Sequence, residues 1–81
     1  MAIPPNINRE KLSEVALAIL ALTMFRDHHV VRAWKGMDWE LLDMLYQKGW
    51  IDDPKGRAKS VVLTDEGARL ADDLLQRHFG V

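Results

Sequence analysis

The chain has 81 residues, of which 48% are hydrophobic and 28% charged, with a formal net charge of −1. This composition is typical of a soluble globular domain and excludes a disordered or fibrous chain. There is no cysteine, which excludes disulfide scaffolds, thiolate zinc sites and thiol catalysis. The length predicts one domain over residues 1–81, and the near-neutral charge does not point to a strongly basic nucleic-acid-binding domain.

The first predicted element is a helix that follows an extended lead-in over residues 1–7. Pro4 and Pro5 disfavour helix in that lead-in. Asn8, or Asn6, then caps a helix that is expected to run to about Phe25. The residues spaced by three and four along its inner stripe are Leu12, Val15, Ala16, Ile19, Leu20 and Thr23.

The second half of this helix is apolar nearly all round, so it must be covered on more than one face. Either the other elements wrap it, or a second copy of the chain covers it. We favour self-association, which predicts a homodimer. The side chains predicted for its interface are Leu17, Leu20, Ala21 and Met24.

The middle of the chain predicts a short extended piece within residues 26–37 and then a second helix. Val30, Val31 and Trp34 favour the extended conformation, and Gly36 marks a turn. Asp38 is a good N-cap, and Gly49 ends the helix. The side chains expected to point inward from it are Leu41, Leu42 and Leu45, with Trp39 or Met44.

A β-hairpin and a last helix complete the predicted fold. Asp53-Pro54-Lys55-Gly56 matches a type I turn between strands near residues 50–52 and 58–63. Thr64 caps the last helix, and Gly67 indicates a close approach of this helix to the hairpin. Its expected inner stripe is Leu70, Ala71, Leu74, Leu75 and His78 or Phe79.

The predicted class is therefore mainly α with a small β-hairpin (α+β), in the order helix, short strand, helix, hairpin (wing), helix. The pattern Leu42-x-x-Leu45-x-x-x-Gly49-x-Ile51, followed by Val61-x-Leu63-Thr64-x-x-Gly67, resembles the wing half of MarR-like and PadR-like winged-helix regulators over about residues 38–79. This resemblance implies a winged-helix-like domain whose helix before the wing reads DNA while the wing contacts phosphates.

A closer resemblance, over nearly the whole chain, is to a family of small bacterial proteins with no assigned function. It rests on Arg32-Ala33-Trp34-Lys35-Gly36-x-Asp38-Trp39 and on Asp53-Pro54-x-Gly56-x-Ala58-Lys59-Ser60-Val61. This second resemblance implies no mechanism.

The charges do not favour insertion of the second helix into DNA. Asp38, Glu40 and Asp43 oppose only Lys48 there, whereas DNA binding gains affinity by neutralising phosphates. The basic residues lie in other segments. Those of the wing have an alternative explanation, because lysines on a sheet edge also prevent aggregation. The candidate phosphate contacts are Lys55, Arg57 and Lys59 of the wing, with Arg32 and Lys35.

Three tryptophans offer a second candidate site. Trp34, Trp39 and Trp50 flank the second helix and fit either an aromatic pocket or a small core filled by large side chains. We assign Trp39 and Trp50 to the core and Trp34 to ligand or partner contact. His28 and His29 would point to opposite faces of a strand, so we predict no metal site; no catalytic or cofactor-binding motif is recognised.

These features predict a non-enzymatic, winged-helix-type interaction module without cofactor, which self-associates through its first helix and contacts a protein partner. One alternative is a transcription regulator that touches double-stranded DNA mainly through its basic wing. A weaker alternative is a small-molecule sensor that uses the tryptophans. The longest apolar run, residues 15–22, is too short to span a bilayer, and the N-terminal residues do not resemble a signal peptide, so we expect a cytoplasmic protein with no membrane contact.

Overall fold

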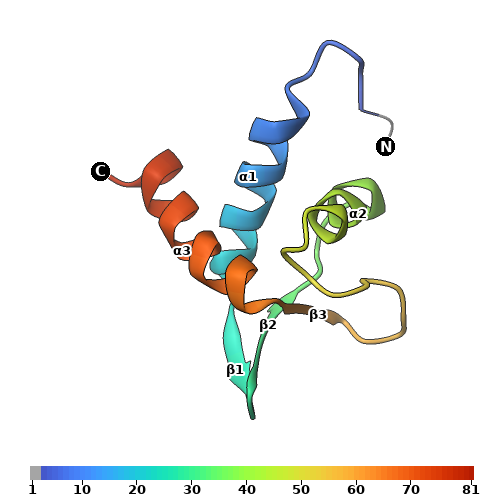
Figure 1. Ribbon diagram of the computed structural model, residues 1–81, viewed down its shortest axis with the longest axis vertical. Coiled ribbons are helices and arrows are strands. Elements are labelled where there is room, and N and C mark those ends of the chain that lie inside the picture. Colours follow the sequence, from blue (N-terminus) through green and yellow to red (C-terminus); the bar gives the residue numbers. More distant parts are fainter. Residues whose placement is uncertain (1–2) are drawn as a thin grey trace.

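A computed structural model describes residues 3–81; the first two residues of the predicted lead-in lie outside the described part. Within residues 3–81 the chain forms three helices and one antiparallel sheet of three strands. This confirms the predicted α+β class with its order of helix, strand, helix, hairpin and helix (Figure 1). The elements are α1 (Arg9–Ala21), β1 (Phe25–Asp27), β2 (Val30–Trp34), α2 (Trp39–Gln47), β3 (Ser60–Leu63) and α3 (Asp65–Phe79).

Helix α1 begins where the sequence predicts and ends earlier. The Asn8 side chain accepts a hydrogen bond from the Lys11 N–H at 3.0 Å, so Asn8 is the N-cap. The helix stops at Ala21, and the expected continuation to Phe25 is wrong because Phe25 opens β1. Thr23 links the turn after α1 to the sheet, because its hydroxyl accepts a hydrogen bond from the Trp34 N–H at 3.1 Å.

The single extended piece expected in residues 26–37 is in fact a hairpin of two strands. Strand β1 pairs with β2 in antiparallel register, with Phe25 opposite Arg32. His28 makes the turn with φ of 59°, a left-handed conformation that few residues with a side chain adopt. This hairpin extends away from the helices at the end of α1 (Figure 1).

The predicted second hairpin is present in a reduced form. Its second strand is β3, but β3 pairs along its length with β2 rather than with residues 50–52. The first strand is a single bridge between Ile51 and Leu63, supported by a bond from the Asp52 N–H to the Val62 carbonyl at 2.9 Å. The predicted turn is replaced by a loop over residues 52–59, which bends at Gly56 with φ of 137°.

Helix α2 is capped by Asp38 as predicted, with the Glu40 N–H donating to the Asp38 carboxylate at 3.0 Å. Leu42, Met44 and Leu45 are its buried side chains. Trp39 is 56% exposed, so its assignment to the core is wrong. Trp50 is half-buried against the core, as predicted.

Helix α3 begins at the predicted cap, since the Thr64 hydroxyl accepts the Gly67 N–H at 3.0 Å. A Cβ at Gly67 would lie 1.9 Å from the Trp50 carbonyl oxygen, which confirms the predicted close approach. Helix α3 lies beside α1 (Figure 1), and the core sits between these helices, α2 and the sheet. Its largest fully buried apolar side chains are Leu17, Leu20, Leu42, Leu45, Ile51 and Leu74.

Candidate functional site

The loop over residues 52–59 presents three cations and is held in place by a fourth. Lys55, Arg57 and Lys59 are exposed. The Lys35 ammonium donates to the carbonyls of Pro54 at 2.8 Å and Gly56 at 3.3 Å. It also lies 5.3 Å from the centre of the Trp39 ring. Lys35 therefore anchors the loop, while the other three cations are turned to solvent.

Arg32, the remaining candidate phosphate contact, lies on the sheet. Its Nε donates to the Ser60 hydroxyl at 3.2 Å and is 3.8 Å from the Asp27 carboxylate. The side chain is 23% exposed. Arg32 is thus positioned by neighbouring strands, with its guanidinium on the surface of the sheet.

The alternation of side chains along the strands gives the sheet two unlike faces. Val31, Ala33, Val61 and Leu63 belong to one set, which packs into the core. The opposite face, here called the outer face, carries Phe25, Asp27, Val30, Arg32, Trp34, Ser60 and Val62. On this face Phe25, Asp27, Val30 and Trp34 are exposed, whereas Arg32, Ser60 and Val62 are half-buried.

An aromatic pair marks the outer face. The rings of Phe25 and Trp34 have centroids 5.8 Å apart and are tilted by 39°. Trp34 is 53% exposed and Phe25 is 39% exposed. Trp34 therefore lies where a ligand or partner could reach it. Sequence reasoning missed Phe25 because it extended α1 too far, and the three residues of β1 are too few to show a strand pattern.

The apolar side chains that the first helix exposes are not the ones predicted for its interface. Leu17 and Leu20 are fully buried in the core of their own chain, and Ala21 and Met24 pack against that core. None of these four forms an open apolar face. Exposed apolar surface on α1 comes instead from Ile19 and Leu22, which are 47% and 68% exposed.

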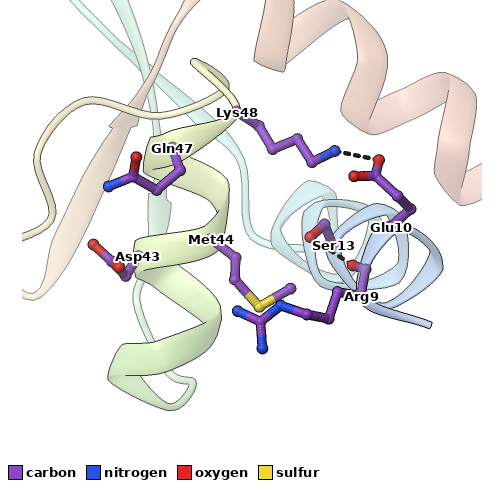
Figure 2. Close-up of a pocket in the computed structure, with 7 residues that line it drawn as sticks. All are labelled: Arg9, Glu10, Ser13, Asp43, Met44, Gln47 and Lys48. Atoms are coloured by element: carbon purple, nitrogen blue, oxygen red, sulfur yellow. Dashed lines mark hydrogen bonds and ion pairs between the residues drawn. The ribbon is translucent and has the colours of Figure 1, made fainter. Parts of the chain in front are cut away.

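A groove of about 360 Å³ lies between the start of α1 and α2 (Figure 2). Lys48 and Glu10 form an ion pair across one end of it, and the Ser13 hydroxyl is bonded to the Arg9 carbonyl at 2.8 Å. Figure 2 shows Met44 pointing toward Arg9, while Asp43 projects from the other side of α2. The groove therefore brings together no acid, base and nucleophile that could act jointly.

The three tryptophans have different neighbours rather than one shared pocket. Trp34 contacts Phe25, Trp39 lies beneath the Lys35 ammonium, and the Lys48 ammonium is 5.7 Å from the centre of the Trp50 ring. A shallow apolar groove does lie beside Trp39, lined also by Pro54 and Lys55.

One titratable group, Asp38, has a pKa shifted by its surroundings. The hydrogen bond from the Glu40 N–H lowers the pKa of Asp38 below its ordinary value of 3.8. His28 and His29 lie at the hairpin turn, whereas His78 is bonded to Glu14 at 3.0 Å between α3 and α1. Within this part of the chain no three His, Asp or Glu side chains converge on a metal-sized site.

Residues 8–81 match the model of the protein family described as "Domain of unknown function (DUF6429)". The chain belongs to this family. A DUF6429 assignment agrees with the resemblance to small bacterial proteins of unassigned function. A curated relative, "Uncharacterized protein y4hR" of Sinorhizobium fredii (strain NBRC 101917 / NGR234), is 44% identical over 74 residues. That alignment covers 91% of this chain and 96% of the relative.

No solved structure matches the chain. Over the described residues, each helix falls short of the length and apolar character needed to cross a bilayer.

Proposed function

We propose that this DUF6429 protein is a non-enzymatic interaction module with the element order of a winged helix, and that it self-associates through the outward side of α1. The observation that carries the proposal is the exposure of Ile19 on α1 and of Leu22, the C-cap of this helix, two large apolar side chains about one turn apart. Exposed apolar side chains that gather on one face mark interaction surfaces.

These two side chains continue a longer stripe. Leu12, Val15, Ile19 and Leu22 are spaced by three, four and three residues, so they fall within an arc of about 80° around α1. The other sides of α1 are occupied, since Glu10 is paired with Lys48 after α2, and Glu14 is bonded to His78 of α3. A second α1 laid antiparallel would place Leu12 opposite Leu22 and Val15 opposite Ile19, which makes the stripe self-complementary about a two-fold axis.

Light scattering coupled to gel filtration tests this proposal. At tens of micromolar protein, we expect twice the 9.3 kDa mass of the chain. Replacing Ile19 and Leu22 together by Glu should give the monomer mass, because each chain would have to bury two charges in the dimer. Tyr46→Glu, which alters an exposed ring on α2, is the matched control and should leave the dimer intact. A wild-type monomer at this concentration contradicts self-association.

A second candidate function is contact with double-stranded DNA through the loop over residues 52–59. It is favoured by the exposure of Lys55, Arg57 and Lys59 on one loop. The acidic α2 does not favour reading of the major groove, because Asp43 is exposed on that helix. Contact would therefore be made mainly with phosphates and would depend little on base sequence.

Fluorescence anisotropy with labelled duplex DNA tests this candidate. If the three loop cations carry the contact, the logarithm of the affinity should fall with the logarithm of salt concentration at a slope of about −3. Replacing all three by Ala should abolish binding. An affinity that the triple variant leaves unchanged rejects loop contact.

A further inference from the structure

The outer face of the sheet takes no part in the proposed self-association through α1, and its composition is unusual. A solvent-facing side of an antiparallel sheet is ordinarily polar. Here it carries the paired Phe25 and Trp34 rings, and Val30 is also exposed on it. Arg32 lies directly opposite Phe25 across the β1–β2 ladder. Two aromatic rings and a guanidinium thus share one open surface.

Basic charge is concentrated around this aromatic pair. Residues 25–35 and the loop over residues 52–59 hold six of the 11 Lys and Arg residues of the chain and three of its 12 acidic residues. The two segments adjoin, because Trp34 pairs with Ser60 and the Lys35 N–H donates to the Lys59 carbonyl. The aromatic pair therefore lies between the hairpin tip, which carries His28 and His29, and the cations of the loop. Arg26, opposite Val31, belongs to the other face of the sheet.

From this surface we propose that the outer face binds single-stranded nucleic acid, with bases stacked on Trp34 and Phe25 and phosphates held by Arg32 and the loop cations. Aromatic platforms within a positively charged track are how proteins bind single strands with little sequence preference, because every base offers a flat π-face. Two rings accommodate about two bases, as on other aromatic sheet surfaces.

Arg32 distinguishes this ligand from an apolar protein partner. Asp27, the acidic residue of the outer face, lies 3.8 Å from the Arg32 Nε, and the guanidinium keeps further N–H donors. An apolar partner would remove this group from water without supplying acceptors, which is costly. A phosphate supplies two acceptors in the geometry that a guanidinium prefers.

The exposed aromatic rings also favour single strands over duplexes as the ligand. In a duplex the bases are stacked on one another, so their faces are not free to cover an indole ring. Duplex DNA can still reach the loop cations through its phosphates. The two modes therefore differ in their dependence on Trp34, which is the basis of the test.

The experiment measures binding of labelled oligothymidylate and oligouridylate of about 12 nucleotides, by fluorescence anisotropy at about 50 mM salt. We expect the wild-type protein to bind both strands. Trp34→Ala should weaken binding about tenfold or more, the usual loss when one stacking partner is removed. Tyr46→Ala, which removes an exposed aromatic ring on α2, is the matched control and should change the affinity less than twofold. Phe25→Ala should weaken binding in the same direction as Trp34→Ala.

Three results would overturn the proposal. The first is no binding of either single strand at this salt concentration, and the second is equal affinity in the wild type and Trp34→Ala. The third is retention of an acidic aromatic peptide, but not of either strand, in a way that depends on Trp34, since it would assign the face to a protein. A duplex that binds independently of Trp34 supports separate loop contact. Circular dichroism of each variant checks that it is folded, and Trp34→Phe, which keeps an aromatic ring, should retain most of the affinity.

Discussion

Gly67 shows how one residue fixes the distance between two elements. Helix α3 and the segment after α2 approach so closely there that a Cβ would lie 1.9 Å from the Trp50 carbonyl oxygen. The contact is with backbone, which cannot rotate away. The glycine weakens the first turn of α3 by about 1 kcal/mol relative to alanine, so the close packing must outweigh that loss.

We therefore expect Gly67→Ala to destabilise the protein by about 2 kcal/mol or more, because the strain of overpacking exceeds the gain in helix propensity. Urea denaturation followed by circular dichroism measures the change. Gly36→Ala is the control: a Cβ at Gly36 meets nothing within 4 Å, so its midpoint should stay near the wild-type value. Equal midpoints for Gly67→Ala and the wild type would show that the two segments separate easily.

Asp38 gives the fold a pH dependence at the start of α2. The Glu40 N–H stabilises the ionised carboxylate and lowers its pKa in the folded state. A lowered pKa means that the stabilisation is fully present above the unfolded pKa and is lost as the pH falls through the folded value. This contribution should therefore disappear below about pH 4.

Asp38→Asn isolates this effect, because asparagine caps a helix about as well as aspartate but does not titrate. Between about pH 6 and pH 3, the urea midpoint of the wild type should fall further than that of the variant. Asp43→Asn, at an exposed position of the same helix, is the control and should follow the wild type. Parallel curves for wild type and Asp38→Asn would exclude Asp38 as the titrating group.

At the scale of elements, the loop over residues 52–59 owes its position to a residue outside it. Two of its carbonyls accept hydrogen bonds from the Lys35 ammonium at the end of β2. The loop itself contains no helix or strand. The placement of Lys55, Arg57 and Lys59 therefore depends on Lys35.

Lys35→Met should loosen this loop without unfolding the domain. Loss of hydrogen bonds to a charged donor corresponds to about 1.5 kcal/mol, so cleavage of the loop by a non-specific protease should become roughly tenfold faster. Limited proteolysis followed by mass spectrometry measures the cleavage rates at residues 55–59. Lys55→Met, which removes an exposed ammonium of the loop itself, should leave those rates nearly unchanged, and similar rates in both variants would contradict the anchoring role.

The helices were easier to predict than the strands, and the caps explain why. Asn8, Asp38 and Thr64 each bond an N–H within the next three residues, so the signal for a helix start is local in sequence. Strand pairing is not local. Residues 58–63 could be recognised as a strand, but their partner is β2, about 30 residues earlier, and β1 is too short for its pattern to be read.

At the scale of the whole molecule, a net charge of −1 conceals a strongly polarised surface. We expect the protein to be retained on immobilised heparin at about 50 mM salt despite this net charge, because local fields rather than totals govern contact with a polyanion. Replacing Lys55, Arg57 and Lys59 by Ala should lower the salt needed for elution. Replacing Arg9, Lys11 and Arg69 by Ala changes the net charge equally and should have less effect; equal shifts would mean that no basic side exists.

The sequence by itself determined the α+β class, the order of the three helices, the three helix caps and the need for Gly67, because these depend on local hydrogen bonding and on periodicity. Only the tertiary structure decided which apolar side chains face outward. Leu17 and Ile19 are equally apolar and two residues apart, yet one is buried by α3 and the sheet while the other is exposed. Likewise, Phe25 became the partner of Trp34 only when β1 folded back on β2. Burial is set by what packs from distant parts of the chain, and that information lies in the contacts between elements rather than in the pattern of any one of them.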